Sequence, residues 1–171
     1  MCKRIVGLDP IVFEDSKILI VGSMPSAISL KEQMYYANKN NRFWKILKEI
    51  FQTEDKIELL KVSHIALWDI CHSCIRKTSA DSEIKDIVPN DIPKLLDSYK
   101  NIEKVICNGR TSQNTMQKYF PNIETVYCPS TSSANAQFSL EQLIEIYKKE
   151  FYEQTILGKS KGGCEGSAKA L

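Results

Sequence analysis

Short apolar runs alternate with amphipathic stretches along most of the chain. Four runs have the length of buried strands, and they lie at 17–21 (KILIV), 63–70 (SHIALWDI), 104–107 (KVIC) and 124–128 (ETVYC). Helices are predicted at 43–51, 92–99, about 111–119 and 140 to about 155, with one further helical turn at 58–61. Because helical segments separate the strands, the pattern predicts an α/β fold with three layers, in which helices cover both faces of a short four-stranded parallel sheet.

Three of the predicted strands end in a loop of small and polar residues. The loop 22–26 (GSMPS) follows the first strand, Asn108-Gly109 follows the third, and 129–136 (PSTSSANA) follows the fourth. The carboxyl ends of parallel strands share one edge of the sheet, where open α/β sheets bind ligands. We therefore expect a cleft lined by backbone amides, hydroxyls and carboxamides, with almost no acidic residue. Such a lining suits a phosphodiester with its base, although Ser and Asn could also serve only as helix caps.

Aromatic and amide side chains are concentrated between the first strand and the first helix. Tyr35 and Tyr36 are followed by Asn41, Phe43 and Trp44. Aromatic rings stack on nucleobases, and a carboxamide can read a base edge or hold a water molecule. The alternative is that the rings are core residues. Asn41 is also a favoured N-cap residue, so we expect the helix at 43–51 to begin at or just before it.

Composition and charge limit the possible partners. The chain has 171 residues, 43% of them hydrophobic and 26% charged, which is typical of one globular domain, here predicted at 1–157. The net charge of +2 predicts no strongly basic face, so any binding of nucleic acid must depend on local placement of Lys and Arg. No apolar run approaches a membrane span and no signal peptide is evident, so we expect a cytoplasmic protein. The Gly-, Lys- and Ser-rich tail, 158–171, is predicted to be flexible.

Six cysteines, at positions 2, 71, 74, 107, 128 and 164, are expected to be free thiols in a reducing compartment. Cys71 and Cys74 have the spacing of a metal-binding pair but lack a second close pair, so no metal and no cofactor is predicted. A cluster with Cys107 and Cys128 remains open. A nucleophilic pair of Cys71 and His72 is disfavoured, because adjacent residues on a strand point to opposite faces. The segment 71–89 is otherwise predicted to be a long polar loop.

Several motifs occur together in a specific order, namely Gly-Ser-Met-Pro-Ser at 22–26, Tyr-Tyr-Ala at 35–37, Asn-Arg-Phe-Trp at 41–44, Ala-Leu-Trp-Asp-Ile at 66–70, Cys-Asn-Gly at 107–109 and Pro-Ser-Thr-Ser-Ser-Ala-Asn at 129–135. In this combination the chain, over about 5–150, resembles the hypoxanthine-DNA glycosylase (DNA-deoxyinosine glycosylase) branch of the uracil-DNA glycosylase superfamily. The resemblance implies the short parallel sheet of that superfamily. We expect a monomer, and we infer no cofactor and no obligate protein partner. Its substrate would be DNA with a deaminated base, and its reaction would be hydrolysis of the N-glycosidic bond, leaving an abasic site.

The resemblance assigns roles to residues around the first motif. Gly22, Ser23 and Met24 match base-binding positions. In the mismatch-specific relatives the third residue of this motif is the asparagine that positions the attacking water, but Met24 can neither accept a proton nor hold a water. In this branch Asn41 is used instead, and we assign it the catalytic role.

The remaining roles follow from the same resemblance. Tyr36 matches the ring that stacks on the extruded base, and Asn108 matches the asparagine that reads the base edge. The remaining assigned residues would contact DNA, and they are Pro25, Ser26, Ser130, Thr131, Ser132, Ser133 and Asn135. One departure is that Asn38-Lys39 replaces the His-Pro that usually precedes the Asn-x-Phe-Trp motif, so activity or base preference could differ.

The chemistry of base removal is compatible with these residues. Breaking a glycosidic bond places positive charge on the sugar and negative charge on the base, so it requires a positioned water and hydrogen-bond donors for the base. Because a carboxamide does not titrate near neutral pH, Asn41 would orient and polarise the water.

Two other functions remain open. The protein could bind a damaged base without cutting, or it could be a small-molecule hydrolase with Cys71 as its nucleophile.

Overall fold

The structure, a computed structural model, describes residues 3–153 and contains two β-sheets. The larger sheet has the strand order β3 (Ile65–Asp69), β2 (Ile18–Gly22), β6 (Lys104–Asn108) and β7 (Val126–Cys128). All three strand pairs in it are parallel. The predicted four-stranded parallel sheet is therefore confirmed.

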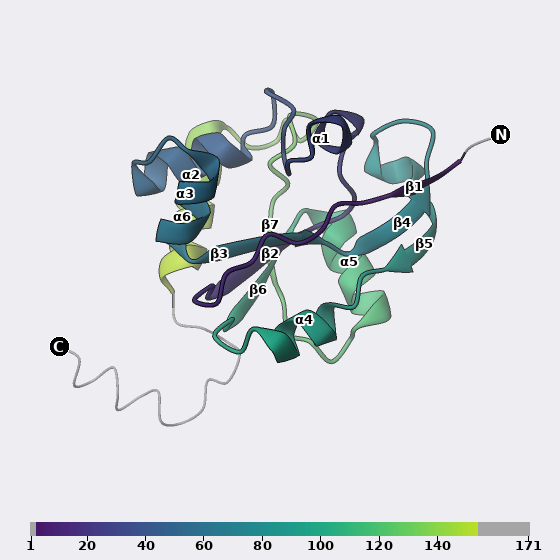
Figure 1. Ribbon diagram of the computed structural model, residues 1–171. Coiled ribbons are helices and arrows are strands. Elements are labelled where there is room, and N and C mark those ends of the chain that lie inside the picture. The colour runs from purple at the N-terminus through teal and green to yellow at the C-terminus, as the bar shows by residue number, and fades with distance from the viewer. Residues whose placement is uncertain (1–2, 154–171) are drawn as a thin grey trace.

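Helices cover both faces of this sheet (Figure 1). On one side lie α2 (Phe43–Phe51), α3 (Lys56–Ser63) and α6 (Leu140–Tyr152), and on the other lie α4 (Ile92–Ser98) and α5 (Arg110–Tyr119). The three-layer α/β/α arrangement predicted from the sequence is thus present. Among residues 3–153, no helix combines the length and the apolar character needed to cross a bilayer.

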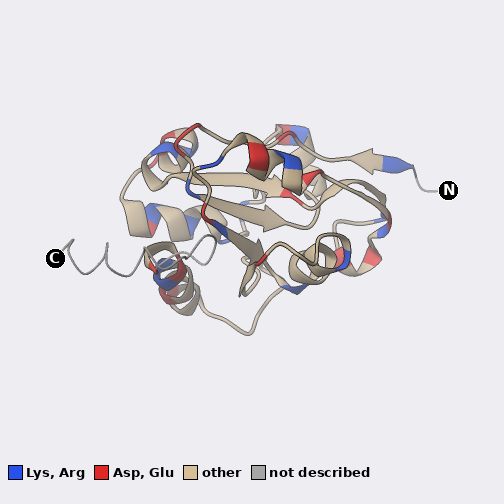
Figure 2. Ribbon diagram, turned by 90° about the horizontal axis from the view of Figure 1, so that it is seen from below, with Lys and Arg blue, Asp and Glu red and all other residues tan. Residues whose placement is uncertain are grey.

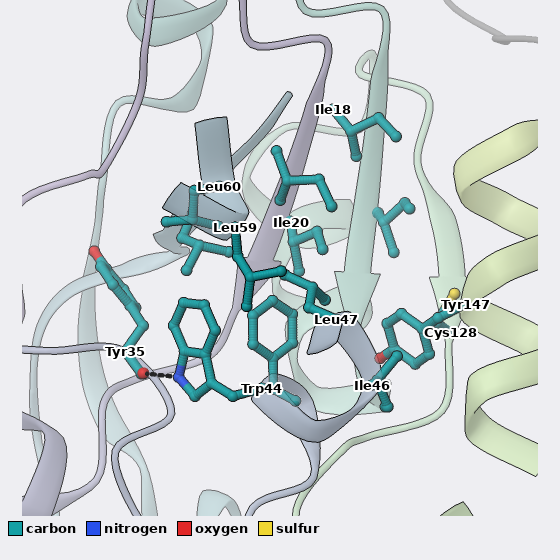
Figure 3. Packing of buried hydrophobic residues seen from close by; sticks show 14 of the residues in the cluster. Ile18, Ile20, Tyr35, Trp44, Ile46, Leu47, Leu59, Leu60, Cys128 and Tyr147 are labelled. Atoms are coloured by element: carbon teal, nitrogen blue, oxygen red, sulfur yellow. Dashed lines mark hydrogen bonds between the residues drawn. The ribbon is translucent and has the colours of Figure 1, made fainter. Parts of the chain in front are cut away.

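The alternation of side chains along β2 divides the core into two clusters. Ile18 and Ile20 pack with Phe43 and Leu47 of α2, whereas Leu19 and Val21 point to the opposite face of the sheet. Figure 3 shows the first cluster, in which the aromatic rings of α2 and α6 lie against the strands. Parallel strands that are buried on both faces read as continuous apolar runs, which is why these strands could be identified from the sequence.

A second, antiparallel sheet was not predicted. It contains β1 (Arg4–Val6), β4 (Cys71–Ile75) and β5 (Lys85–Pro89), in the order β1, β4, β5. The prediction of a long loop at 71–89 is therefore wrong, since this segment contains two strands and the short 3₁₀ helix η1 (Asp81–Glu83). Strand β4 is mostly buried but contains His72 and Ser73, and β5 is largely exposed and begins with Lys85 and Asp86, so neither has the continuous apolar run that marks the main sheet.

Several element boundaries also differ from the prediction. Helix α2 begins at Phe43 and not at Asn41. Its N-cap residue is Arg42, and Asn41, one residue earlier, accepts the Phe43 N–H with its Oδ1 at 2.9 Å. Helix α3 extends through Ser63, so β3 begins at Ile65. A short helix that was not predicted, α1 (Ala27–Glu32), follows the loop 22–26. The flexible tail predicted at 158–171 lies outside the described residues.

Asn90 fixes the junction at which the chain leaves the main sheet for the second one. Ile70 alone separates β3 from β4. The buried Asn90 side chain donates from Nδ2 to the Asp69 carbonyl at 2.7 Å and to the Cys71 carbonyl at 3.3 Å. Its backbone N–H donates to the Ile70 carbonyl at 2.7 Å. Three consecutive carbonyls therefore depend on one residue.

We predict that Asn90→Ala lowers the free energy of unfolding by roughly 1–3 kcal/mol, because it leaves the buried Asp69 and Cys71 carbonyls without this donor. Urea unfolding measures the effect. Asn122→Ala is the matched control, since Asn122 is exposed and its truncation is expected to change stability by less than about 0.5 kcal/mol. Equal effects of the two substitutions would contradict the role assigned to Asn90.

Candidate active site

One cavity of about 630 Å³ lies at the carboxyl edge of the main sheet. Every site residue predicted from the sequence lines it, and these residues are Gly22, Ser23, Met24, Pro25, Ser26, Tyr36, Asn41, Asn108, Ser130, Thr131, Ser132, Ser133 and Asn135. The cavity also includes residues that were not predicted, among them Asp69 and Asp81. Its volume falls in the range of pockets that enclose small ligands.

Thr131 joins the two asparagines of the site. The Asn108 Nδ2 donates to the Thr131 Oγ1 at 3.1 Å, and the Thr131 N–H donates to the Asn108 Oδ1 at 3.0 Å. The Thr131 hydroxyl in turn donates to the Asn41 Oδ1 at 2.8 Å. Since the same oxygen of Asn41 also accepts the Phe43 N–H, its Nδ2 group is the end left to interact with a ligand. The network therefore fixes both carboxamide orientations.

Thr131 itself is 1% exposed, so its hydroxyl is occupied inside the protein. That placement suits the positioning of Asn41 and Asn108 better than contact with a DNA phosphate, which was the role inferred from the sequence. No sequence signal separates Thr131 from the neighbouring serines, because its partners are distant along the chain.

Arg42 holds the loop after β7 against the start of α2. Its guanidinium donates to the carbonyls of Phe138 at 2.6 Å, and of Ser132 and Asn135 at 2.8 Å each. Its backbone N–H donates to the Thr131 carbonyl at 3.0 Å. Arg42 belongs to the Asn-Arg-Phe-Trp motif, but the sequence alone predicts no role for it. The structure shows that it joins the start of α2 to the loop after β7.

Tyr36 forms an aromatic wall of the cavity. Its ring stacks on Phe43 with centroids 4.3 Å apart and an interplanar angle of 30°. The backbone of Tyr36 has a φ of 54°, in the left-handed region that non-glycine residues seldom adopt. Such strain is maintained by the surrounding packing, and it is common at functional sites. Tyr35, by contrast, is a core residue, and its hydroxyl donates to the Asp9 carbonyl at 2.7 Å.

Three neighbouring strand ends form the floor of the cavity. Gly22 of β2 is in register with Asp69 of β3, and Asn108 lies at the end of β6 on the other side of β2. A Cβ atom at Gly22 would overlap the Asp69 Oδ1 and would lie 3.1 Å from the Tyr36 Oη. The glycine therefore permits the close approach of a carboxyl and a phenol at this point.

The cavity contains two carboxyl groups, although the sequence predicted almost no acidic residue there. Asp69 is 4% exposed, and burial raises the pKa of its carboxyl to about 7, with the Asp81 carboxylate adding to the effect and Arg76 and the Gly22 amide opposing it. Asp81 lies at the rim, where the Ser23 hydroxyl donates to its Oδ1 at 2.8 Å. It was missed because the segment that carries it was predicted to be a long polar loop, and none of its residues was assigned to the site. Asp69 could have been found from the sequence, because it is an acidic residue at the end of an otherwise apolar strand.

Other predicted residues contribute mainly through structure. Met24 is 7% exposed and packs in the core cluster with Val21, so the position that holds asparagine in the mismatch-specific relatives is here a core position. The Ser26 Oγ caps helix α1 by accepting the Ser29 N–H at 3.1 Å. The Asn38 side chain lines the cavity and accepts the Asn40 N–H at 2.9 Å.

The four cysteines in the described part of the chain are buried free thiols. Within residues 3–153 no group of His, Cys, Asp or Glu side chains has a metal-binding arrangement. Cys71 is buried whereas His72 is exposed, as expected for adjacent strand residues. Burial raises the pKa of the Cys71 thiol to about 12, which suppresses the thiolate that a nucleophile requires. These observations argue against a hydrolase that uses Cys71.

Charged residues of both signs are distributed over the helices and loops, while the strands of the main sheet carry few (Figure 2). This agrees with a net charge of +2. Among the described residues that line the cavity, none is Lys or Arg. A polyanionic ligand would therefore be held there by backbone amides, hydroxyls and carboxamides.

The fold and the cavity together define a class, an α/β protein whose sheet edge carries a cavity lined by an aromatic ring and a pair of oriented carboxamides. A family model described as the uracil DNA glycosylase superfamily matches residues 10–154, and the chain belongs to this superfamily. The resemblance drawn from the sequence motifs is thereby confirmed.

Similar proteins are known from two archaea. A hypoxanthine DNA glycosylase of Methanosarcina acetivorans is 35% identical over 81% of this chain and 92% of its own length. A protein of the same name from Methanosarcina barkeri is 33% identical over 62% of this chain and 72% of its own length. The NMR structure of a candidate uracil DNA glycosylase from Methanosarcina acetivorans superimposes with a TM-score of 0.70 at 28% identity, covering 88% of this chain and all of that chain.

The raised pKa of Asp69 makes a prediction about stability. Asp69 in the folded protein keeps its proton up to about pH 7, whereas in the unfolded chain it loses the proton near its ordinary value of 3.8. The stability of the wild type therefore contains a contribution that is complete below about pH 4 and lost as the pH rises to about 7. We predict that Asp69→Asn, which carries no charge at any pH, becomes more stable relative to the wild type over this range, by up to about 4 kcal/mol.

Urea unfolding at pH 5 and pH 8 measures this difference. Asp97→Asn is the control, because Asp97 is exposed and its substitution is expected to have the same small effect at both pH values. A difference between Asp69→Asn and the wild type that does not change between the two pH values would show that Asp69 is ionised in the fold.

Proposed function

We propose that the protein is a monofunctional DNA glycosylase that removes hypoxanthine from DNA, with uracil and xanthine as further candidate substrates. The chain's family makes it a DNA glycosylase of the uracil DNA glycosylase superfamily, and two relatives are named for action on hypoxanthine. The observation that carries the proposal is the single cavity in which Tyr36, Asn108 and Asn41 meet.

Recognition of the base begins with its removal from the duplex. Extruding a base costs a few kcal/mol of free energy, because stacking and pairing are lost. The cost is smaller for a mispaired deaminated base. Inside the cavity the base would stack on Tyr36, whose ring is already held by Phe43. The Asn108 carboxamide, fixed at both ends by Thr131, would read the base edge.

Hydrolysis requires water at C1′ of the sugar and donors around the base. The free Nδ2 end of Asn41 would orient this water, while backbone N–H groups of Ser23, Met24 and Ser26 would stabilise negative charge on the departing base. Asn41 does not remove the water's proton, because a carboxamide does not titrate in this range. The proton is released only after the oxygen has bonded to C1′.

The DNA backbone would contact the rim of the cavity. Ser23, Ser26 and Ser133 present partly or fully exposed side chains there. Since such contacts are to phosphate, we expect little dependence on sequence around the damaged base.

The direct test uses end-labelled duplexes with one inosine or one uracil, followed by cleavage of abasic sites with alkali and separation on a gel. We expect a single break at inosine.

A second candidate function is a module that binds damaged bases without cutting, and the core placement of Met24 favours it. Specific binding to inosine-containing DNA with no break at either base would establish that alternative.

We predict that Asn41→Ala lowers the single-turnover rate of inosine excision by at least about 10²-fold, because the attacking water is no longer oriented. Binding to inosine-containing DNA should change little, and fluorescence anisotropy measures it. Asn40→Ala is the matched control, because Asn40 is adjacent and its side chain is exposed outside the cavity. Normal turnover by Asn41→Ala would remove the catalytic assignment.

We predict that Thr131→Val also lowers the excision rate, on the order of 10²-fold, since it disconnects Asn41 from Asn108 while keeping the size of the side chain. Thr131→Ser keeps the hydroxyl and should retain most of the activity. The comparison separates the hydrogen bonds from packing. An active Thr131→Val beside an impaired Thr131→Ser would show that packing of the methyl group, and not the hydroxyl, supports the site, and equal losses in the two variants would show that the hydroxyl has no special role.

A further inference from the structure

The floor of the cavity holds two buried polar atoms without a partner in the described structure. They are the Oη of Tyr36 and the Oδ2 of Asp69. Both side chains line the cavity, and both lie beside Gly22, where β2 ends. Leaving a buried polar group unpaired is costly, so such groups in a binding cavity indicate a ligand that completes them.

The position of Asp69 determines which part of a ligand it meets. Asp69 is 4% exposed and lies on the sheet itself, while Asn41 is half-buried at the start of α2. On the proposed function, an extruded nucleotide enters base first and its sugar stays near the mouth. A group on the floor therefore meets the edge of the base, and the water that attacks C1′ lies on the side of Asn41.

We propose that Asp69 is a catalytic acid that donates its proton to the base as the glycosidic bond breaks. In this step the O–H bond of the Asp69 carboxyl breaks and its proton bonds to an acceptor atom of the base. The bond between C1′ and the base nitrogen breaks, and its electron pair stays with the base. Water then bonds to C1′ and releases a proton to solvent, and Asp69 regains its proton from solvent. The products are the neutral base and an abasic site.

The surroundings of Asp69 favour its neutral form. The titratable and charged groups that face it are Tyr35, Tyr36, Cys71, Arg76 and Asp81. The one cation among them, the Arg76 guanidinium, donates to the Pro25 carbonyl. Burial and the Asp81 carboxylate together raise the pKa of Asp69 to about 7. An acid whose pKa lies near the working pH transfers its proton most effectively there.

Single-turnover excision of inosine between pH 5.5 and 8.5 tests this role, with wild type, Asp69→Asn and Asp97→Asn. We expect the wild-type rate to be level below about pH 7 and to fall about tenfold per pH unit above it. Asp69→Asn has the same size and still donates a hydrogen bond, but it has no proton to transfer. Its rate should be at least about 10²-fold lower at pH 6 and independent of pH, whereas Asp97→Asn should match the wild type.

Asp81→Asn gives a second measurement that does not depend on altering Asp69. Removing this carboxylate should lower the pKa of Asp69 and move the falling limb of the rate profile to lower pH. An unshifted limb would contradict the proposal, as would a wild-type rate in Asp69→Asn. A rate that rises with pH through 7 would make Asp69 a base and not an acid. Failure of the wild type to release hypoxanthine would instead overturn the proposed function.

Discussion

The hydroxyl of Thr131 holds together parts of the chain that are far apart in sequence. It accepts a hydrogen bond from Asn108 and donates one to Asn41, which is 90 positions away. One asparagine ends a strand and the other precedes a helix, so neither element alone determines their relative position. The geometry of the cavity therefore depends on this buried network, and Arg42 supports it by binding the carbonyls of the same loop.

The parallel sheet explains why such distant residues meet. The carboxyl ends of β3, β2, β6 and β7 lie along one edge, and each is followed by a segment that contributes to the cavity or its support. The second sheet adds to this edge, because the segment between β4 and β5 carries Asp81 to the rim. In the proposed mechanism Asn41 acts from outside the first motif, so Met24 is free to serve as a core residue.

The main sheet and the loops that border the cavity could be obtained from the sequence because their signals are local, whereas individual site residues were assigned from the family resemblance. A buried parallel strand is a continuous apolar run, and the small polar residues after it mark the ligand edge. The second sheet could not be obtained in this way, since polar residues interrupt Cys71–Ile75 and Lys85–Pro89 is largely exposed. The raised pKa of Asp69 could not be predicted from the sequence either. Its burial and its neighbours, including Asp81, depend on how β4 and η1 fold back over the sheet.

The unpaired atoms on the cavity floor give the clearest physical indication of a ligand. The most direct measurement is a crystal structure of the protein bound to a duplex with 2′-fluorinated deoxyinosine, whose glycosidic bond resists cleavage. We expect the hypoxanthine ring against Tyr36, with its edge within hydrogen-bond distance of Asn108 and Asp69, and a water between Asn41 and C1′. A base that remains stacked in the duplex, or that lies outside this cavity, would contradict the site described above.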